Sequence, residues 1–278
     1  LVEISPTNWI ELREIYRKNW PKHHVAYSTI DNFIKWFKKD SKIKNLKIYS
    51  VNGNWRNDGT YLIIDRYQLF IYSFDETGDL LRAGLNLLDW SKGFKVSSVL
   101  ERHRQPVIDI IAAKNLKLEY DSFTLLYFLP KEEAKNIDLV LPDGFKLHSL
   151  SEDDAAKADA VWPNRHEGSL FFLKRLAAWN PNVGLYNEQD ELVAWCFRLQ
   201  AGPLGALQVD EKHYKKGYGS IVTKAMVKIL TENGMDTFAL VGEQNIPSRK
   251  MFEKLGFKIT DNSYWIRTYP TVDCTWTD

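Results

Sequence analysis

Two glycines separated by one tyrosine, Gly217 and Gly219, stand where an apolar strand pattern gives way to an amphipathic helix pattern. The strand is expected over Leu204–Val209 and the helix over Gly219–Asn233, with a basic loop between them. The first N–H groups of a helix are unpaired and lie at the positive end of its dipole, so they attract phosphate oxygens. Without a Cβ atom, a glycine lets a pyrophosphate come close to the backbone. A tight turn without a ligand is the alternative interpretation.

A second pattern follows in the same half of the chain. A strand is expected over Thr237–Val241, and Asn245 and Ser248 then precede a short helix that ends at Leu255. Helix capping, with Pro247 in the first turn, would explain the asparagine and the serine without any ligand. The two patterns occur together and in a fixed order, which favours one shared ligand.

The remaining segments predict helices and strands in two halves with a similar order. In the first half, helical spacing or strand-like runs cover Trp9–Tyr16, Ile30–Phe37, Leu46–Val51, Tyr61–Asp65, Leu69–Ser73, Thr77–Trp90, a helix that opens near Pro106, and a strand pair at Leu116–Tyr120 and Thr124–Leu129. In the second half they cover Phe145–Leu150, Ala155–Val161, Ser169–Ala178, Val183–Tyr186, Leu192–Gln200 and, after the glycine turn, closing strands to Tyr269.

A charged segment with two prolines, Pro130–Gly144, is typical of a linker. We therefore predict two domains, residues 1–138 and 139–278. The run Phe123–Pro130 is echoed by Ser263–Pro270, and the matching order of elements indicates two copies of one α/β unit. The first half has no Gly-x-Gly at the matching place, so only the second is expected to bind an anion.

Composition excludes several classes of protein. The net charge is +1, which gives no basic field for nucleic acid. No run of about 18 apolar residues is present to span a bilayer. Two cysteines predict no disulfide framework and an intracellular setting. Leu1–Trp20 shows neither a secretory nor a transit pattern. His23-His24 has no spaced partner, so no metal site is expected.

The glycine turn and the Asn245–Ser248 pattern both resemble motifs of the GNAT superfamily of acyl-CoA-dependent N-acyltransferases, and the resemblance extends over roughly Phe145–Pro270. The family loop Arg/Gln-x-x-Gly-x-Gly/Ala corresponds to Tyr214–Gly219, and its Asn-x-x-Ser and Phe-x-x-Leu-Gly-Phe motifs to Asn245–Phe257. Within the superfamily, the chain is most similar to glycine N-acyltransferases. The resemblance implies an α/β (α+β) GNAT fold, with a mixed, mostly antiparallel central sheet flanked by helices and two GNAT-like halves in tandem.

The same resemblance implies a role for each matching position. The backbone of Leu207, Gln208 and Val209 would pair with the pantetheine arm of an acyl-CoA, the co-substrate. The loop and helix start would hold its pyrophosphate through Tyr214, Lys215, Lys216, Gly217, Tyr218, Gly219 and Ser220. Asn245, Ser248 and Phe252 would line the pantetheine and the thioester.

Three positions depart from the family pattern. Tyr214 replaces the usual Arg or Gln of the loop, and Phe252 replaces a tyrosine that protonates the departing thiolate. Pro203 stands where glycine acyltransferases carry a glutamate base. Because an amine must lose a proton before it attacks, a substitute base is needed. The candidates are Glu211, Glu243, His213 or an ordered water, and Tyr218 is the candidate acid.

We therefore predict transfer of an acyl group from acyl-CoA to a small-molecule amine such as glycine or another amino acid. A catalytically weak acyl-CoA sensor is the alternative. Trp162 and Arg165 fall where GNAT proteins build the acceptor pocket, and Arg165 could pair with a carboxylate. An ordinary loop is the other interpretation of this segment. No nucleic-acid partner is expected. A mitochondrial or cytoplasmic location and the oligomeric state stay open.

Overall fold

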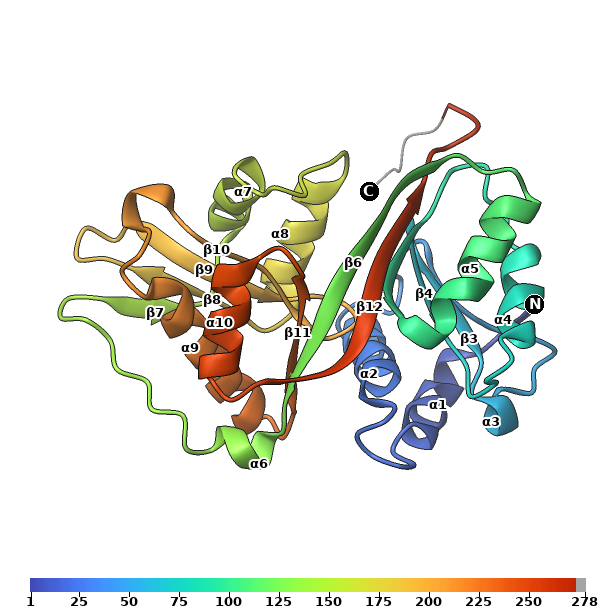
Figure 1. Ribbon diagram of the computed structural model, residues 1–278, viewed down its shortest axis with the longest axis horizontal. Helices are drawn as coiled ribbons and strands as arrows, with labels where there is room; N and C mark the ends of the chain where they lie inside the picture. Colours follow the sequence, from blue (N-terminus) through green and yellow to red (C-terminus); the bar gives the residue numbers. More distant parts are fainter. Residues whose placement is uncertain (274–278) are drawn as a thin grey trace. The chain divides into compact units, whose positions relative to one another are not determined.

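The computed structural model describes residues 1–273, which form two compact units. Unit 1 contains Leu1–Leu125 together with the described segment that begins at Asp261, and unit 2 contains Leu126–Thr260. Two long strands, β6 (Leu118–Leu129) and β12 (Lys258–Thr268), each run from one unit into the other (Figure 1).

Unit 1 is a twisted sheet covered by helices. Its strand order is β1-β2-β3-β4-β5-β12-β6. The pairs β1–β2, β2–β3 and β3–β4 are antiparallel, β4 and β5 run parallel, and β12 is antiparallel to β5. The elements are β1 (Val2–Glu3), α1 (Trp9–Ile15), α2 (His24–Lys39), β2 (Leu46–Ser50), α3 (Trp55–Asp58), β3 (Tyr61–Asp65), β4 (Gln68–Tyr72), α4 (Asp79–Asn86), β5 (Lys95–Leu100) and α5 (Glu101–Ala113).

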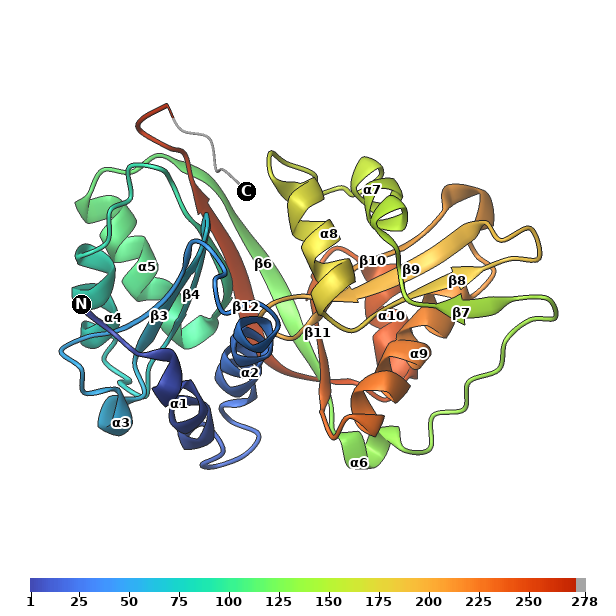
Figure 2. The ribbon, with the colours of Figure 1, turned by 180° about the vertical axis from the view of Figure 1, so that it is seen from behind.

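Unit 2 repeats this order. Its strands run β6-β11-β10-β9-β8-β7, antiparallel from β7 to β10 and parallel between β10 and β11. The elements are α6 (Lys131–Ala134), β7 (Lys146–His148), α7 (Glu152–Ala160), α8 (Ser169–Trp179), β8 (Asn182–Tyr186), β9 (Leu192–Arg198), β10 (Leu204–Val209), the 3₁₀ turn η2 (Glu211–His213), α9 (Tyr218–Glu232), β11 (Thr237–Gly242) and α10 (Ile246–Lys254). Helices α7 and α8 lie on one side of β8–β10, and α9 and α10 lie on the other (Figures 1 and 2).

The predicted fold class is confirmed: the sheets are mixed, mostly antiparallel and flanked by helices. The two halves also share one element order, which ends in each case with a parallel strand, a helix and a long closing strand. The predicted division at residues 138/139 concerns these sequence halves and stays a prediction. The boundary between unit 1 and unit 2 lies instead within β6 and within β12.

Two local predictions are wrong. Pro106 does not open its helix but lies inside α5, which begins five residues earlier at Glu101. Proline has no backbone N–H to donate, yet Pro106 is buried and packs over Gly78, where a Cβ would lie 2.6 Å from the Pro106 Cγ. The predicted strand pair between Leu116 and Leu129 is one strand, β6, because Asp121 and Ser122 continue the extended chain instead of turning.

Within residues 1–273, no helix has the length and apolar character that crossing a membrane requires. The same residues contain no group of three or more His, Cys, Asp or Glu side chains arranged to hold a metal ion.

Candidate functional site

The centre of unit 2 is the point where β10 leaves its regular pairing. Leu204 lies opposite Ala239 of β11 in the parallel pair, and the register with β9 then shifts between Gly205 and Gln208. Ala206 has a φ of +45°, in the region that side chains avoid. Such a bulge re-aims a strand. From Gly205 to Val209 the strand is half-exposed, whereas Leu204 is buried.

The loop after β10 presents a row of backbone donors. Lys215 and Gly217 both have left-handed backbone conformations, with φ of +63° and +81°. Within residues 1–273, the N–H groups from Lys215 to Gly219 have no hydrogen-bond acceptor. The N–H of Ser220, which follows them, donates to the carbonyl of Gly217 at 3.0 Å. The start of α9 therefore offers consecutive N–H groups to an anion.

Packing does not explain the second glycine of the turn. A Cβ at Gly219 would lie 3.5 Å from Val209 Cγ2 and 3.7 Å from Met251 Sδ, which are ordinary contacts. At Gly217 no atom lies within 4 Å of the Cβ position. A glycine inside a helix costs about 1 kcal/mol relative to alanine. The Cβ position of Gly217 is open, and that of Gly219 meets only ordinary contacts. Both glycines therefore fit a group that must approach the backbone closely, as a pyrophosphate would.

Asn245 and Ser248 lie at the start of α10. The Asn245 side chain accepts the N–H of Ser248 at 3.2 Å, so the capping interaction expected from sequence is present. Both residues leave some surface exposed. Met251, one turn further on, contacts Thr223 of α9 through its sulfur at 3.8 Å. Contact of the asparagine and the serine with pantetheine stays a prediction.

Phe252 points into the core and not to solvent. Its side chain is 2% exposed, and its ring stacks on Tyr127 at 5.9 Å and meets Phe257 edge-on at 5.0 Å. The Tyr127 hydroxyl donates to Glu253 at 2.8 Å and accepts from Arg249 at 3.3 Å. The packing thus gives Phe252 a structural role, and its predicted contact with the cofactor is untested.

The four acid–base candidates divide into two groups. His213 and Tyr218 lie together, with ring centroids 6.1 Å apart, and Tyr218 also meets Phe145 at 5.1 Å. His213 Nδ1 is buried without a recorded partner in residues 1–273. Glu211 and Glu243 are exposed, the first in η2 and the second just past β11. Only the histidine and the tyrosine are brought into contact.

Two buried residues near β10 limit the chemistry. Pro203, at the position of the family's base, is buried, and its carbonyl accepts the N–H of Leu199 at 2.9 Å. Burial raises the pKa of the Cys196 thiol well above its ordinary value. A thiol that keeps its proton is a poor nucleophile, so Cys196 is unsuited to covalent catalysis.

The loop between α7 and α8 holds both substrate candidates. Trp162 stacks on Phe172, with centroids 6.0 Å apart and planes 13° from parallel. Arg165 donates from Nε to Asp159 at 3.1 Å, and Asp159 is 3% exposed and also hydrogen-bonded to Ser169. The guanidinium is thereby oriented through one edge, while 63% of the arginine side chain stays exposed.

Sequence reasoning missed two side chains of this region. The Gln208 side chain donates to the carbonyl of Val161 at 2.9 Å and ties the α7–α8 loop to β10. Trp195 of β9, directly opposite, is fully buried. A strand pattern shows that a residue faces the core, but it does not show which polar atoms meet across the sheet.

The comparisons with known proteins concern the fold. Residues 182–266 match a family model described as FR47-like protein. No curated protein is significantly similar to the chain in sequence. A protein from Drosophila has a similar structure, with a TM-score of 0.88, 23% identity, and coverage of 97% of this chain and 98% of that one.

Two other solved structures carry acyltransferase descriptions. A tandem GNAT protein from the clavulanic acid biosynthesis pathway matches with a TM-score of 0.58 and 12% identity over 98% of each chain. A GCN5-related N-acetyltransferase from Kribbella flavida matches with a TM-score of 0.53 and 11% identity, over 86% of this chain and 95% of that one. These likenesses show that the chain has a GNAT-like fold in tandem arrangement.

Proposed function

We propose that this protein is an acyl-CoA-dependent N-acyltransferase whose acceptor is the amine of a small molecule such as glycine or another amino acid. The observation that carries the proposal is the row of N–H groups from Lys215 to Gly219, which have no hydrogen-bond acceptor in residues 1–273, at a turn where the Cβ position of Gly217 is open. Lys215 and Lys216 are exposed and add positive charge for a pyrophosphate.

The pantetheine arm would lie along β10, where Gly205–Val209 is half-exposed beyond its pairing with β11. The backbone of Leu207, Gln208 and Val209 would pair with its amides. Asn245 and Ser248, at the start of α10, would flank it from the β11 side. When bound, the thioester supplies an already activated acyl group, so no covalent enzyme intermediate is required.

The acceptor would bind under the α7–α8 loop, with Trp162 as a wall. Arg165 is suited to a carboxylate because buried Asp159 holds its Nε and leaves the outer edge of the guanidinium exposed. An amino acid therefore fits this position better than a simple alkylamine does. The protein would contribute positioning and backbone hydrogen bonds to the developing oxyanion.

A catalytically weak acyl-CoA sensor is the second candidate. Two observations favour it: Pro203 offers no proton acceptor, and Phe252 is buried against Tyr127. Tyr218 could supply a proton, but its ring is engaged with Phe145 and His213. The two candidates share the cofactor site and differ only in turnover.

Thermal shift and release of free CoA thiol separate these candidates. The wild-type protein is mixed with acyl-CoAs of increasing chain length, each with glycine, other amino acids and arylalkylamines. Stabilisation together with thiol release supports the enzyme, and stabilisation without release from any pair supports the sensor. Gly219→Val should abolish stabilisation by acyl-CoA while the fold persists, and persistent binding would refute the loop assignment. Lys228→Ala, on the exposed side of α9, is the control.

A further inference from the structure

Two polar side chains on neighbouring strands face the same side of the unit 2 sheet. Trp195 of β9 lies directly opposite Gln208 of β10, and residues opposite each other in an antiparallel pair project to one face. Gln208 donates to the carbonyl of Val161 at the end of α7. This face is therefore the one that α7 and α8 cover.

The neighbouring residue of β10 confirms the direction. A methyl group of Val209 lies 3.5 Å from the Cβ position of Gly219 in α9. Val209 thus projects to the α9 face, where the pyrophosphate turn lies, and Gln208 projects to the opposite face. The side chain of Gln208 accordingly reaches the acceptor side of the strand.

The two side chains present complementary polar atoms. Trp195 Nε1 is a donor, Gln208 Oε1 is an acceptor, and both are buried without a hydrogen-bond partner in residues 1–273. The Trp195 residue is 0% exposed. Buried polar groups are in general hydrogen-bonded to protein or to ordered water. One small group that accepts one bond and donates another would satisfy both atoms.

We propose that Trp195 and Gln208 bind an ordered water molecule that takes the proton from the attacking amine. The inference rests on the proposed function and supplies the proton acceptor that Pro203 cannot. The water accepts from Trp195 Nε1 and donates one hydrogen to Gln208 Oε1, which leaves a lone pair for an N–H of the acceptor. Its location beside the proposed pantetheine strand and under the α7–α8 loop suits this role.

The proton balance is complete within the reaction. The amine nitrogen forms a bond to the acyl carbon, the carbon–sulfur bond breaks, and the electron pair of that bond leaves with the thiolate. The amine proton passes to the water and then, through solvent, to the thiolate. A direct bond from Trp195 to the amine is excluded, because it would occupy the lone pair that must attack.

Trp195→Phe tests the inference, because it keeps an aromatic ring and removes only the indole donor. We expect kcat to fall about a hundredfold, at the lower end of acid–base effects, while the KM for acyl-CoA and its thermal shift stay unchanged. Trp55→Phe, a buried tryptophan of unit 1, should leave both kinetic parameters unchanged. A variant that merely misfolds would lose the thermal shift as well.

The water itself has a readout that does not depend on activity. In protein carrying ¹⁵N-labelled tryptophan, the Trp195 indole N–H, assigned by its loss in Trp195→Phe, should show a magnetisation-transfer peak to a bound water. Gln208→Leu should weaken that peak. Absence of the peak in the wild-type protein overturns the water site, and its presence with unchanged kcat in Trp195→Phe overturns the proton role. Failure of the wild-type protein to release any thiol instead refutes the proposed transferase.

Discussion

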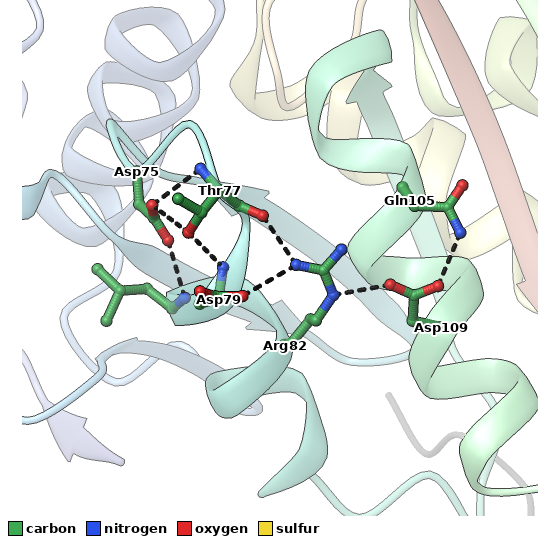
Figure 3. Close-up of polar contacts among 7 residues, drawn as sticks. Asp75, Thr77, Asp79, Arg82, Gln105 and Asp109 are labelled. Atoms are coloured by element: carbon green, nitrogen blue, oxygen red, sulfur yellow. Dashed lines mark hydrogen bonds and ion pairs between the residues drawn. The ribbon is translucent and has the colours of Figure 1, made fainter.

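Asp75 Oδ2 accepts the backbone N–H of Leu80 at 3.0 Å, and this contact places a carboxylate at the start of α4 (Figure 3). Its other oxygen accepts the N–H of Thr77 at 3.0 Å and the threonine hydroxyl at 2.7 Å. In unit 1 the β4–α4 loop stands where unit 2 has the β10–α9 loop. The protein's own anion thus occupies the helix start that unit 2 leaves open.

We therefore expect one acyl-CoA site per chain. Further contacts hold the unit 1 loop closed: Arg82 donates to the Thr77 carbonyl at 2.8 Å and to Asp109 of α5 at 2.7 Å (Figure 3). Titration calorimetry should give a stoichiometry of one acyl-CoA per chain. Asp75→Ala should lower the free energy of unfolding by about 1 kcal/mol and leave this stoichiometry unchanged. Glu76→Ala, an exposed residue of the same loop, is the control. Two equivalents of bound ligand would contradict the assignment.

Gly219→Ala should separate stability from binding. The added methyl group meets Val209 and Met251 only at ordinary contact distance, and alanine favours the helix by up to about 1 kcal/mol. The variant should therefore unfold at a higher denaturant concentration than the wild-type protein, yet bind acyl-CoA at least tenfold more weakly. Equal affinity in both proteins would show that the glycine does not face the ligand.

Asn245 allows capping to be distinguished from ligand contact. Aspartate caps helices as well as asparagine does, whereas alanine costs about 1 kcal/mol. Asn245→Asp should keep the free energy of unfolding and still weaken acyl-CoA binding, because it places a negative charge beside the pantetheine. Asn245→Ala should lose stability as well. If Asn245→Asp binds acyl-CoA as the wild-type protein does, the residue is a cap alone.

Unit 1 should lose stability as the pH falls. Burial first, and to a lesser extent the charge of nearby Arg102, lower the pKa of His24 to about 4 and that of His103 to about 3. Burial, and then the charge of Arg102, lower the pKa of His23 to about 4 as well. Nearby Asp75 has a smaller, opposite effect on His103. These groups bind protons more readily when unfolded, so stability is complete above about pH 6.5 and declines toward pH 4.

His103→Gln measures this effect. The glutamine carbonyl can replace His103 Nε2, which accepts from Arg102 Nε at 3.3 Å. The free energy of unfolding should therefore fall less between pH 7 and pH 5 in the variant than in the wild-type protein. Denaturant titrations at both pH values provide the comparison. An equal fall in the two proteins would mean that His103 does not govern the acid sensitivity.

Local patterns predicted the parts of the fold that follow local rules. The strand before Gly217 and the helix after it have clear periodicity, and Asn245 and Ser248 form the cap that the alternative interpretation expected. Pro106 was misplaced because its burial against Gly78 outweighs its local preference for a first turn. Strands β6 and β12 are neighbours in the sheet although they are far apart in the sequence, and each continues from one unit into the other. No local sequence pattern contains such a long-range pairing.

The sequence predicts the backbone loop of the candidate site better than it predicts which side chains meet there. Two glycines at this spacing predict a loop that a ligand approaches closely, so Gly217 and Gly219 could be proposed from sequence. Their contact with a cofactor stays a prediction. Cross-strand neighbours such as Trp195 and Gln208 depend on a register that includes a bulge, and a shift of one residue would turn each to the opposite face. Asp75 was likewise missed, because its role depends on which N–H groups the loop brings to it.

Arg165 should determine preference among acceptors. Because Asp159 holds its Nε at 3.1 Å, the exposed edge of the guanidinium can bind a carboxylate through two parallel bonds. Arg165→Gln should raise the KM for phenylalanine at least tenfold and leave the KM for phenethylamine, which lacks the carboxylate, unchanged. Arg165→Lys should restore little, because a lysine cannot form the paired contact. Equal changes for both acceptors would show that Arg165 shapes the loop and does not contact the acceptor's carboxylate.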